Sequence, residues 1–114
     1  MKTALPNATV EQKERFRIIK EELGCIACWL DTGYYNPCNV HHLLDTGSRR
    51  GHDFTIGLCE FEEPGAPNHH VGNDMSIHRT KREFTKKYGT DDELLDLTNA
   101  LIMIYKKERE RYET

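Results

Sequence analysis

The sequence predicts a small α+β domain, because helical patterns enclose a middle segment that holds short strand patterns and most of the metal-binding residue types. All four cysteines lie between positions 25 and 59, and all six histidines lie between positions 41 and 78. At 114 residues the chain is expected to form one domain, residues 1–114. We divide it into an N-terminal helix at 9–23, a Cys- and His-rich core at 24–89 and a C-terminal helix at 90–113.

The N-terminal helix is predicted by its start and by its apolar spacing. Thr9 and Gln12 have the spacing of a capping box, in which each side chain binds the other residue's backbone N–H. Phe16, Ile19 and Leu23 fall on one helical face. Gly24 is a suitable residue to end the helix.

The middle segment alternates between short apolar runs and loop composition. We expect residues 25–39 to form a knuckle and loop, and residues 40–44 and 54–58 to form two strands. The stretches 45–53 and 60–68 are rich in turn-forming residues and are expected to be loops. A further helix is expected at 79–88, where Phe84 and Tyr88 recur four residues apart.

The C-terminal helix has the strongest signal of the chain. Thr90 and Glu93 form a second capping-box pattern, and the acidic residues that follow Thr90 suit the positive end of the helix dipole. One apolar face is expected to form core or a dimer contact; its residues are Leu94, Leu97, Leu101 and Ile104.

The composition excludes several classes of protein. No stretch approaches the ~20 apolar residues of a membrane span, and no secretory signal pattern is present, so a cytoplasmic location is expected. The net charge of −3 argues against a globally basic nucleic-acid binder. Leu, Ile, Val and Phe make up only about a fifth of the chain, which is a thin core. Such a domain is expected to need a metal, a disulfide or a partner for stability.

The cysteines and histidines favour a metal. In a reducing compartment, clustered Cys and His are typical of metal ligands, and we expect zinc. A small disulfide-bonded protein without metal is the alternative from the cysteine count alone.

The order of these residues resembles the HNH (His-Me finger) endonucleases. It runs from a helix to two cysteines separated by two residues, a strand ending in two histidines, a strand ending in cysteine, and then further histidines before a helix. It is similar in particular to the phage recombination-enhancement, RecA-dependent nucleases. The stretches that carry the resemblance are 24–28, 40–43, 50–52, 55–59, 69–70 and 81–89. The resemblance implies a zinc-stapled ββα-metal core, two strands and a helix around one metal ion, flanked by the N- and C-terminal helices.

The resemblance implies that a structural zinc ion is bound by Cys25, Cys28, Cys59 and His69. A closed tetrahedral site of this kind leaves no position for substrate, so its role is structural. Nine residues separate Cys59 from His69, more than the family pattern usually has. Cys38 is therefore an alternative fourth ligand in place of His69; otherwise it is a buried thiol.

The resemblance implies a second, catalytic site. His41, His70 and His78 would bind the catalytic metal, Mg²⁺ or Mn²⁺, although a histidine-rich site also suits zinc or nickel. His42 would act as the general base, because neighbouring residues on a strand point to opposite sides and can hold different roles.

Two further residues and an acidic loop lie near this predicted site. His52 and Asp53 occupy the place where the family has a polar residue that holds the base, or else they belong to a solvated loop. The long loop also brings Glu60, Glu62 and Glu63 close to the site, where they would repel a DNA strand.

DNA contact is expected from local positive charge. Basic residues suit phosphate and carry no sequence code, so low sequence specificity is expected. A solvated helix face is the simpler alternative for the same residues. The candidate DNA-binding residues are Arg49, Arg50, Arg79, Lys81 and Arg82.

Taken with the resemblance, the sequence predicts a metal-dependent DNA endonuclease that hydrolyses phosphodiester bonds in single-stranded or duplex DNA. The closer resemblance implies a role in phage recombination, a RecA filament as partner, and a phage or prophage origin. The alternative function is a zinc-stabilised nucleic-acid-binding or adaptor module without catalysis. The sequence leaves the oligomeric state open.

Overall fold

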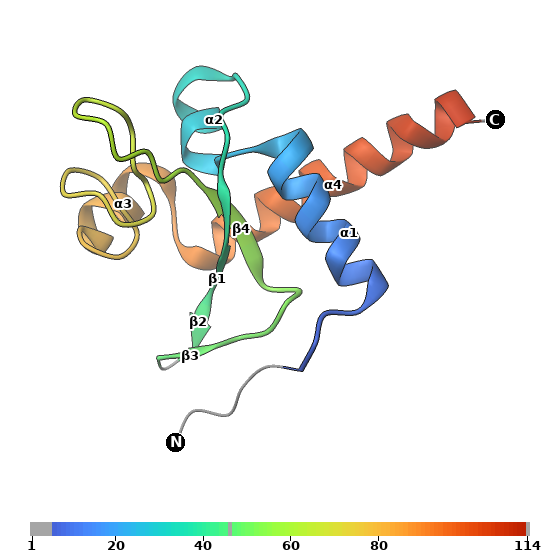
Figure 1. The fold of residues 1–114 in the computed structure, drawn as a ribbon, viewed down its shortest axis with the longest axis horizontal. Helices are drawn as coiled ribbons and strands as arrows, with labels where there is room; N and C mark the ends of the chain where they lie inside the picture. The colour runs from blue at the N-terminus through green and yellow to red at the C-terminus, as the bar shows by residue number, and fades with distance from the viewer. Residues whose placement is uncertain (1–5, 46, 114) are drawn as a thin grey trace.

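The computed structural model describes residues 6–45 and 47–113, and its mixture of helices and small antiparallel sheets confirms the predicted α+β class (Figure 1). Helix α1 lies to one side of the β1–β4 strands and α3 lies to the other side. In chain order the elements are α1 (Val10–Ile18), the π-helical turn η1 (Ile19–Leu23), α2 (Ile26–Thr32), β1 (Asn39–His42), β2 (Leu44–Asp45), β3 (Ser48–Arg49), β4 (Thr55–Leu58), α3 (Lys81–Tyr88) and α4 (Asp91–Glu113).

The central sheet is the antiparallel pair of β1 and β4. His41 pairs with Ile56 and His42 pairs with Thr55. All four residues of β4 are buried, because α2, η1 and α4 pack against this strand. The sheet therefore fixes His41 and His42 on a strand that is anchored in the core.

The first helix begins as the sequence predicts and ends differently. Both capping-box hydrogen bonds between Thr9 and Gln12 are present. The last turn widens into a π-helix, and Gly24 ends it with a positive φ of 72°. The predicted apolar face is incomplete, because Ile18 is as fully buried as Ile19. The wider turn places both side chains in one cluster with Ile102 of α4.

The expectation of a knuckle and loop at 25–39 is wrong in part, because α2 occupies Ile26–Thr32. The Sγ atom of Cys25 accepts a hydrogen bond from the backbone N–H of Cys28 and caps the helix. Gly33 ends it in the left-handed conformation. Seven residues are too few for apolar side chains to recur at a helical spacing, so the sequence did not indicate this helix.

The expected strand at 40–44 is split, and the expected loop at 45–53 contains part of a hairpin. Leu43 separates β1 from β2, and β2 pairs with β3 in its own two-stranded sheet. The backbone N–H of Leu43 binds the carbonyl of Phe54, so the chain stays close to the central pair at this point. The second strand begins at Thr55 rather than at residue 54.

The C-terminal helix packs against the domain as far as Tyr105, and its last turns extend past the rest of the domain (Figure 1). Leu94 is buried as expected and Leu97 and Leu101 are partly buried, but Ile104 is 53% exposed. Ile102 takes the core position instead, because the face of α4 that carries Leu95, Thr98 and Ile102 turns toward the core.

Arg15 ties three elements together. Its guanidinium donates to the Thr55 side chain and carbonyl in β4 at 2.8 and 2.7 Å, and to Asn99 of α4 at 2.8 Å.

No helix within residues 6–45 and 47–113 has the length and apolar character needed to cross a membrane.

Candidate metal centres

Three cysteines and one histidine from three segments of the chain meet in a buried cluster. The ligand atoms of Cys25, Cys28, Cys59 and His69 all lie within 4.8 Å of one another. The Nδ1 atom of His69 lies 3.5, 3.4 and 3.1 Å from the three Sγ atoms, and the Sγ atoms of Cys28 and Cys59 are 3.7 Å apart. Zinc bonds of ~2.3 Å to sulfur and ~2.0 Å to nitrogen in a tetrahedron give edges of about 3.5 to 3.8 Å. The cluster could therefore hold zinc.

Short local contacts bring these four ligands together. Cys25 and Cys28 lie at the start of α2, and Cys59 directly follows β4. The loop after Cys59 returns so that the backbone N–H of His69 binds the Cys59 sulfur at 3.4 Å, and the N–H of His70 binds the Cys59 carbonyl at 3.1 Å. The side-chain amide of Asn36 donates to the Cys28 sulfur at 3.2 Å. N–H donors of this kind stabilise the negative charge of thiolates.

Without a metal, two thiols of the cluster, those of Cys25 and Cys28, stay protonated. The side-chain hydrogen bond to Cys59, together with burial, raises the pKa of Cys25 to about 12. Burial also raises the pKa of Cys28. A bound cation would reverse this preference, because metal ions bind the thiolate and displace the proton.

The outer nitrogen of His69 has a partner that the sequence analysis did not identify. His69 Nε2 lies 3.0 Å from the Tyr88 hydroxyl, which donates to Asp31 at 2.7 Å. Burial and the bond to Asp31 raise the pKa of Tyr88, so the hydroxyl stays protonated. These two hydrogen bonds, from His69 through Tyr88 to Asp31, turn Nδ1 of His69 toward the thiols and link α3 to α2. In the sequence, the spacing of Phe84 and Tyr88 indicated a helix with a packed face and gave no sign of the contact with His69.

Cys38, the alternative fourth ligand, lies outside the cluster. It is half-buried, and its thiol contacts the carbonyl oxygen of Ile19 at 3.6 Å. The structure brings His69, and not Cys38, to the three thiols. All four cysteines are free.

A second cluster consists of three histidines. The ligand nitrogens of His41, His70 and His78 lie within 4.8 Å of one another, and their ring centroids are 4.8 to 5.0 Å apart. His41 is buried, His70 is half-buried and His78 is exposed. Burial, and then the neighbouring His70 and His78, lower the pKa of His41 to about 4. Burial also lowers the pKa of His78. Neutral imidazoles with one open side are suited to binding a metal together with a further ligand.

Backbone bonds close the chain around this second cluster. The N–H of His78 binds the carbonyl of His70 at 3.2 Å, and the N–H of Ile77 binds the carbonyl of His69 at 2.9 Å. His69 and His70 are neighbours that serve different clusters, one among the thiols and one among the histidines. One short segment thus joins the two centres.

His42 lies in a separate contact group with His52. Its Nε2 atom is 3.0 Å from Nδ1 of His52, whose Nε2 is 2.7 Å from the carbonyl oxygen of Pro6. A carbonyl oxygen only accepts, so neutral His52 carries its proton on Nε2 and accepts from His42 at Nδ1. This leaves the lone pair of His42 on its Nδ1 atom. Phe16 of α1 packs edge-on against both rings.

Within the part of the chain that the structure describes, no hydrogen bond joins Asp53 to His42. Its carboxylate accepts from Gln12 at 3.2 Å, so it joins the loop before β4 to α1. Of the two residues proposed to hold His42, the structure brings only His52 to it.

The predicted DNA-binding residues do not form one patch of unpaired charge. Arg50 pairs with Asp92 at 2.8 Å and stacks on Phe54, and Lys81 pairs with Asp91. The two ion pairs line a pocket of about 530 Å³ at the start of α4. Arg79 donates to Asn73, and Arg49 and Arg82 are exposed.

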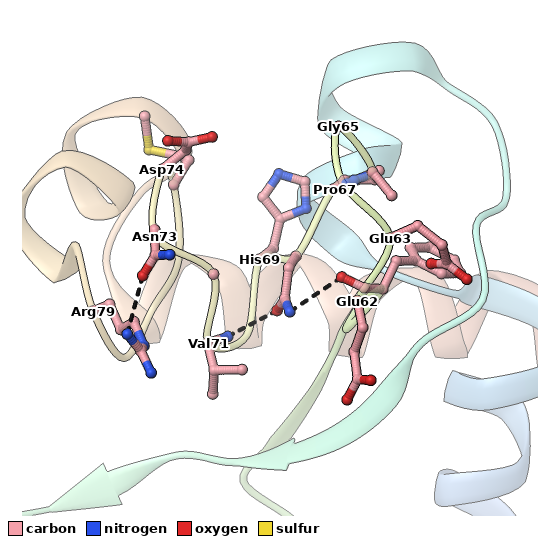
Figure 2. A pocket seen from close by; sticks show the side chains of 14 residues that line it. Glu62, Glu63, Gly65, Pro67, His69, Val71, Asn73, Asp74 and Arg79 are labelled. Carbon is pink, nitrogen blue, oxygen red and sulfur yellow. Dashed lines mark hydrogen bonds between the residues drawn. The ribbon is translucent and has the colours of Figure 1, made fainter.

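The long loop after Cys59 surrounds a pocket of about 580 Å³, and His69 lies between Asp74 and Glu63 along it (Figure 2). Glu62 and Glu63 line this pocket, and the bond between Asn73 and Arg79 lies at its other end. Glu60 instead contacts the histidine cluster, with Oε1 3.0 Å from Nδ1 of His70. From the sequence alone, Glu60, Glu62 and Glu63 were expected only to repel a DNA strand.

Comparison with known families gives one match. The sequence model of the family described as "Recombination enhancement, RecA-dependent nuclease" matches residues 8–103, which contain both clusters. No curated protein and no solved structure matches the chain.

Proposed function

The chain belongs to the family of recombination-enhancement, RecA-dependent nucleases, and we propose that it is an HNH-type, metal-dependent DNA endonuclease. In this proposal residues 1–114 act as one nuclease domain that cuts single-stranded or duplex DNA during phage recombination, in the cytoplasm of the bacterial host. The single observation that carries the proposal is the presence of two metal-ligand clusters with different accessibility.

The two clusters suit different roles. The four thiol and imidazole ligands of the buried cluster fill a tetrahedral shell, as structural zinc sites do. The histidine cluster offers three ligands, and its member His78 is exposed to solvent. An ion held there would keep positions for water and a phosphate oxygen, as catalytic sites require.

His41, His70 and His78 would hold the catalytic ion, for which we propose Mg²⁺ or Mn²⁺. Of the two, Mn²⁺ is the better match, because Mg²⁺ favours oxygen ligands. When bound, the ion would polarise the scissile phosphate and stabilise the charge on the leaving oxygen.

His42 would act as the general base of the reaction. Its Nδ1 lone pair would accept a proton from the attacking water while Nε2 donates to His52. The water oxygen would form a bond to phosphorus while the bond to the 3′ oxygen breaks. The leaving 3′ oxygen would take a proton from solvent, which leaves a 5′-phosphate and a 3′-hydroxyl, and His42 would return its proton to solvent. Burial, and then the positive charge of Arg49, lower the pKa of His42, so the ring is neutral and ready to accept at neutral pH.

DNA binding would use the basic residues beside the histidine cluster. Lys81 and Arg82 begin α3, three and four residues after His78, and Arg49 lies in the hairpin. Arg50 and Lys81 would exchange Asp92 and Asp91 for phosphates when DNA binds. Such contacts position the backbone without reading sequence, and their contribution falls with salt.

A cleavage assay tests this function. Zinc-loaded protein is incubated with single-stranded or supercoiled duplex DNA and Mg²⁺ or Mn²⁺, with and without a RecA filament. We expect the wild type and a Cys38→Ala control to cut DNA and His42→Ala to be at least 100-fold slower, the lower limit typical for loss of a general base. Cutting only in the filament lanes would add RecA as a partner. Folded wild-type protein that binds DNA and cuts in no lane would contradict the proposal and support a nucleic-acid-binding module.

A further inference from the structure

Glu60 is held between the central sheet and the histidine cluster. It directly follows Cys59, and its Oε1 atom lies 3.0 Å from Nδ1 of His70. Its other oxygen accepts from the side-chain amide of Asn39, at the start of β1, at 3.2 Å. Both oxygens therefore have partners, and the carboxylate is fixed in direction rather than extended into solvent.

The carboxylate determines which nitrogen of His70 faces the cluster. An ionised carboxylate only accepts hydrogen bonds, so a neutral His70 carries its proton on Nδ1. The lone pair then lies on Nε2, which is the atom free to bind a metal. A second bond, from the His70 backbone N–H to the Cys59 carbonyl, keeps the segment in place beside Glu60.

We propose that Glu60 is a positioning residue of the histidine site, which orients His70 and increases the electron donation of its Nε2 toward a divalent cation. The inference rests on the proposed function, because it assigns Glu60 a role in the same metal site. Carboxylates that accept from the outer nitrogen of a metal-binding histidine fix the ring and its tautomer, and their loss typically weakens metal binding 10- to 100-fold.

The geometry favours an indirect role over direct ligation. The mutually close ligand atoms belong to three histidines, and Glu60 is not among them. The carboxylate directly contacts His70, so its charge would also offset part of the charge of an incoming cation. Glu62, two residues further along, lines the loop pocket instead and provides a matched control.

The first arm of the experiment measures metal affinity. Full-length zinc-loaded protein is titrated with Mn²⁺, and the free ion is followed by electron paramagnetic resonance. We expect Glu60→Ala to bind Mn²⁺ 10- to 100-fold more weakly than wild type, and Glu62→Ala to bind it within twofold of wild type. Glu60→Gln should fall between them, because its amide oxygen still accepts from His70 but carries no charge. Equal affinities for wild type and Glu60→Ala would overturn the proposal.

The second arm reads the His70 tautomer in protein without Mn²⁺ by long-range ¹H–¹⁵N NMR. We expect a proton on Nδ1 in wild type and in Glu62→Ala, and a mixture of tautomers in Glu60→Ala. A merely structural contact would not select one ring nitrogen. An unchanged tautomer in Glu60→Ala would refute the role of Glu60. Failure of wild type to bind Mn²⁺, with the tautomer shift still present, would contradict the proposed metal site and leave the orientation by Glu60 supported.

Discussion

Replacing Cys59 by alanine, with Cys38→Ala as the matched control, tests whether zinc holds the fold together. Both changes remove one thiol, but only Cys59 belongs to the buried cluster. Its sulfur lies 3.1 Å from His69 Nδ1 and 3.7 Å from the Cys28 sulfur, and it accepts from the His69 backbone N–H. Cys38 makes one weak hydrogen bond, to a carbonyl oxygen at 3.6 Å, and packs half-buried against the apolar clusters.

The expected magnitudes differ strongly. Structural zinc contributes ~10–16 kcal/mol of binding free energy in small domains. The whole stability of a chain of 114 residues is of the same order, about 6–17 kcal/mol. Loss of Cys59 should therefore abolish zinc binding and the cooperative unfolding transition. Loss of the weak Cys38 contact should reduce the free energy of unfolding by about 1 kcal/mol, which lowers Tm by about 4 °C.

The assay combines zinc content by mass spectrometry with thermal unfolding by circular dichroism. The wild type should lose its transition when a chelator removes zinc, and Cys59→Ala should resemble this metal-free state. Cys38→Ala should keep one zinc ion and a transition close to that of wild type. A cooperative, zinc-loaded Cys59→Ala protein would refute the reasoning, and so would a zinc-free Cys38→Ala protein.

Three further predictions follow from the same contacts. Tyr88→Phe removes the hydroxyl between His69 and Asp31 and should weaken zinc binding about 10-fold in a competition assay with a chelating dye; unchanged affinity would contradict the role given to this hydroxyl. Zinc uptake near pH 7 should release at least two protons, one each from Cys25 and Cys28, because their raised pKa values keep these thiols protonated before zinc binds. The apparent zinc affinity should therefore rise with pH, and calorimetry in buffers of different ionisation enthalpy that finds no release would argue against protonated thiols. Gly57→Ala would place a Cβ atom 2.5 Å from the Gly24 carbonyl oxygen and 2.7 Å from the Cys38 sulfur and should cost about 1–3 kcal/mol of unfolding free energy in urea titrations; wild-type stability would show that the segments of Gly24 and Cys38 move apart from β4 more easily than their packing implies.

Local signals in the sequence predicted the starts of the first and last helices well. The capping boxes at Thr9 and Thr90 are both formed, because each depends on residues three apart. The α2 helix was missed, since it is capped by a cysteine and is short. The core position of Ile102 in place of Ile104 depends on which face of α4 turns toward the core. Apolar residues lie on both candidate faces, so local spacing alone does not select it.

The ligand residues could be named from their order along the chain, but their partners could not. Tyr88 and Glu60 contact His69 and His70 from positions 19 and 10 residues away. Tyr88 was expected only to pack on its helix, and Glu60 only to repel DNA. Each contact is identified only once the loop after Cys59 has returned to the sheet. The pairing of Arg50 with Asp92 likewise joins the hairpin to α4 across 42 residues. Charge counted along the sequence therefore overstated the positive charge that is free for DNA.

The central claim is that one cluster holds the fold and the other performs the chemistry. His70→Ala tests this division most directly when zinc content and Mn²⁺-dependent DNA cleavage are measured on the same sample, because His70 adjoins the zinc-cluster residue His69 in sequence. We expect His70→Ala to keep one zinc ion and a cooperative unfolding transition, and its cleavage rate to fall at least 100-fold. Cleavage at the wild-type rate, or loss of the zinc ion together with activity, would contradict the separation of the two sites.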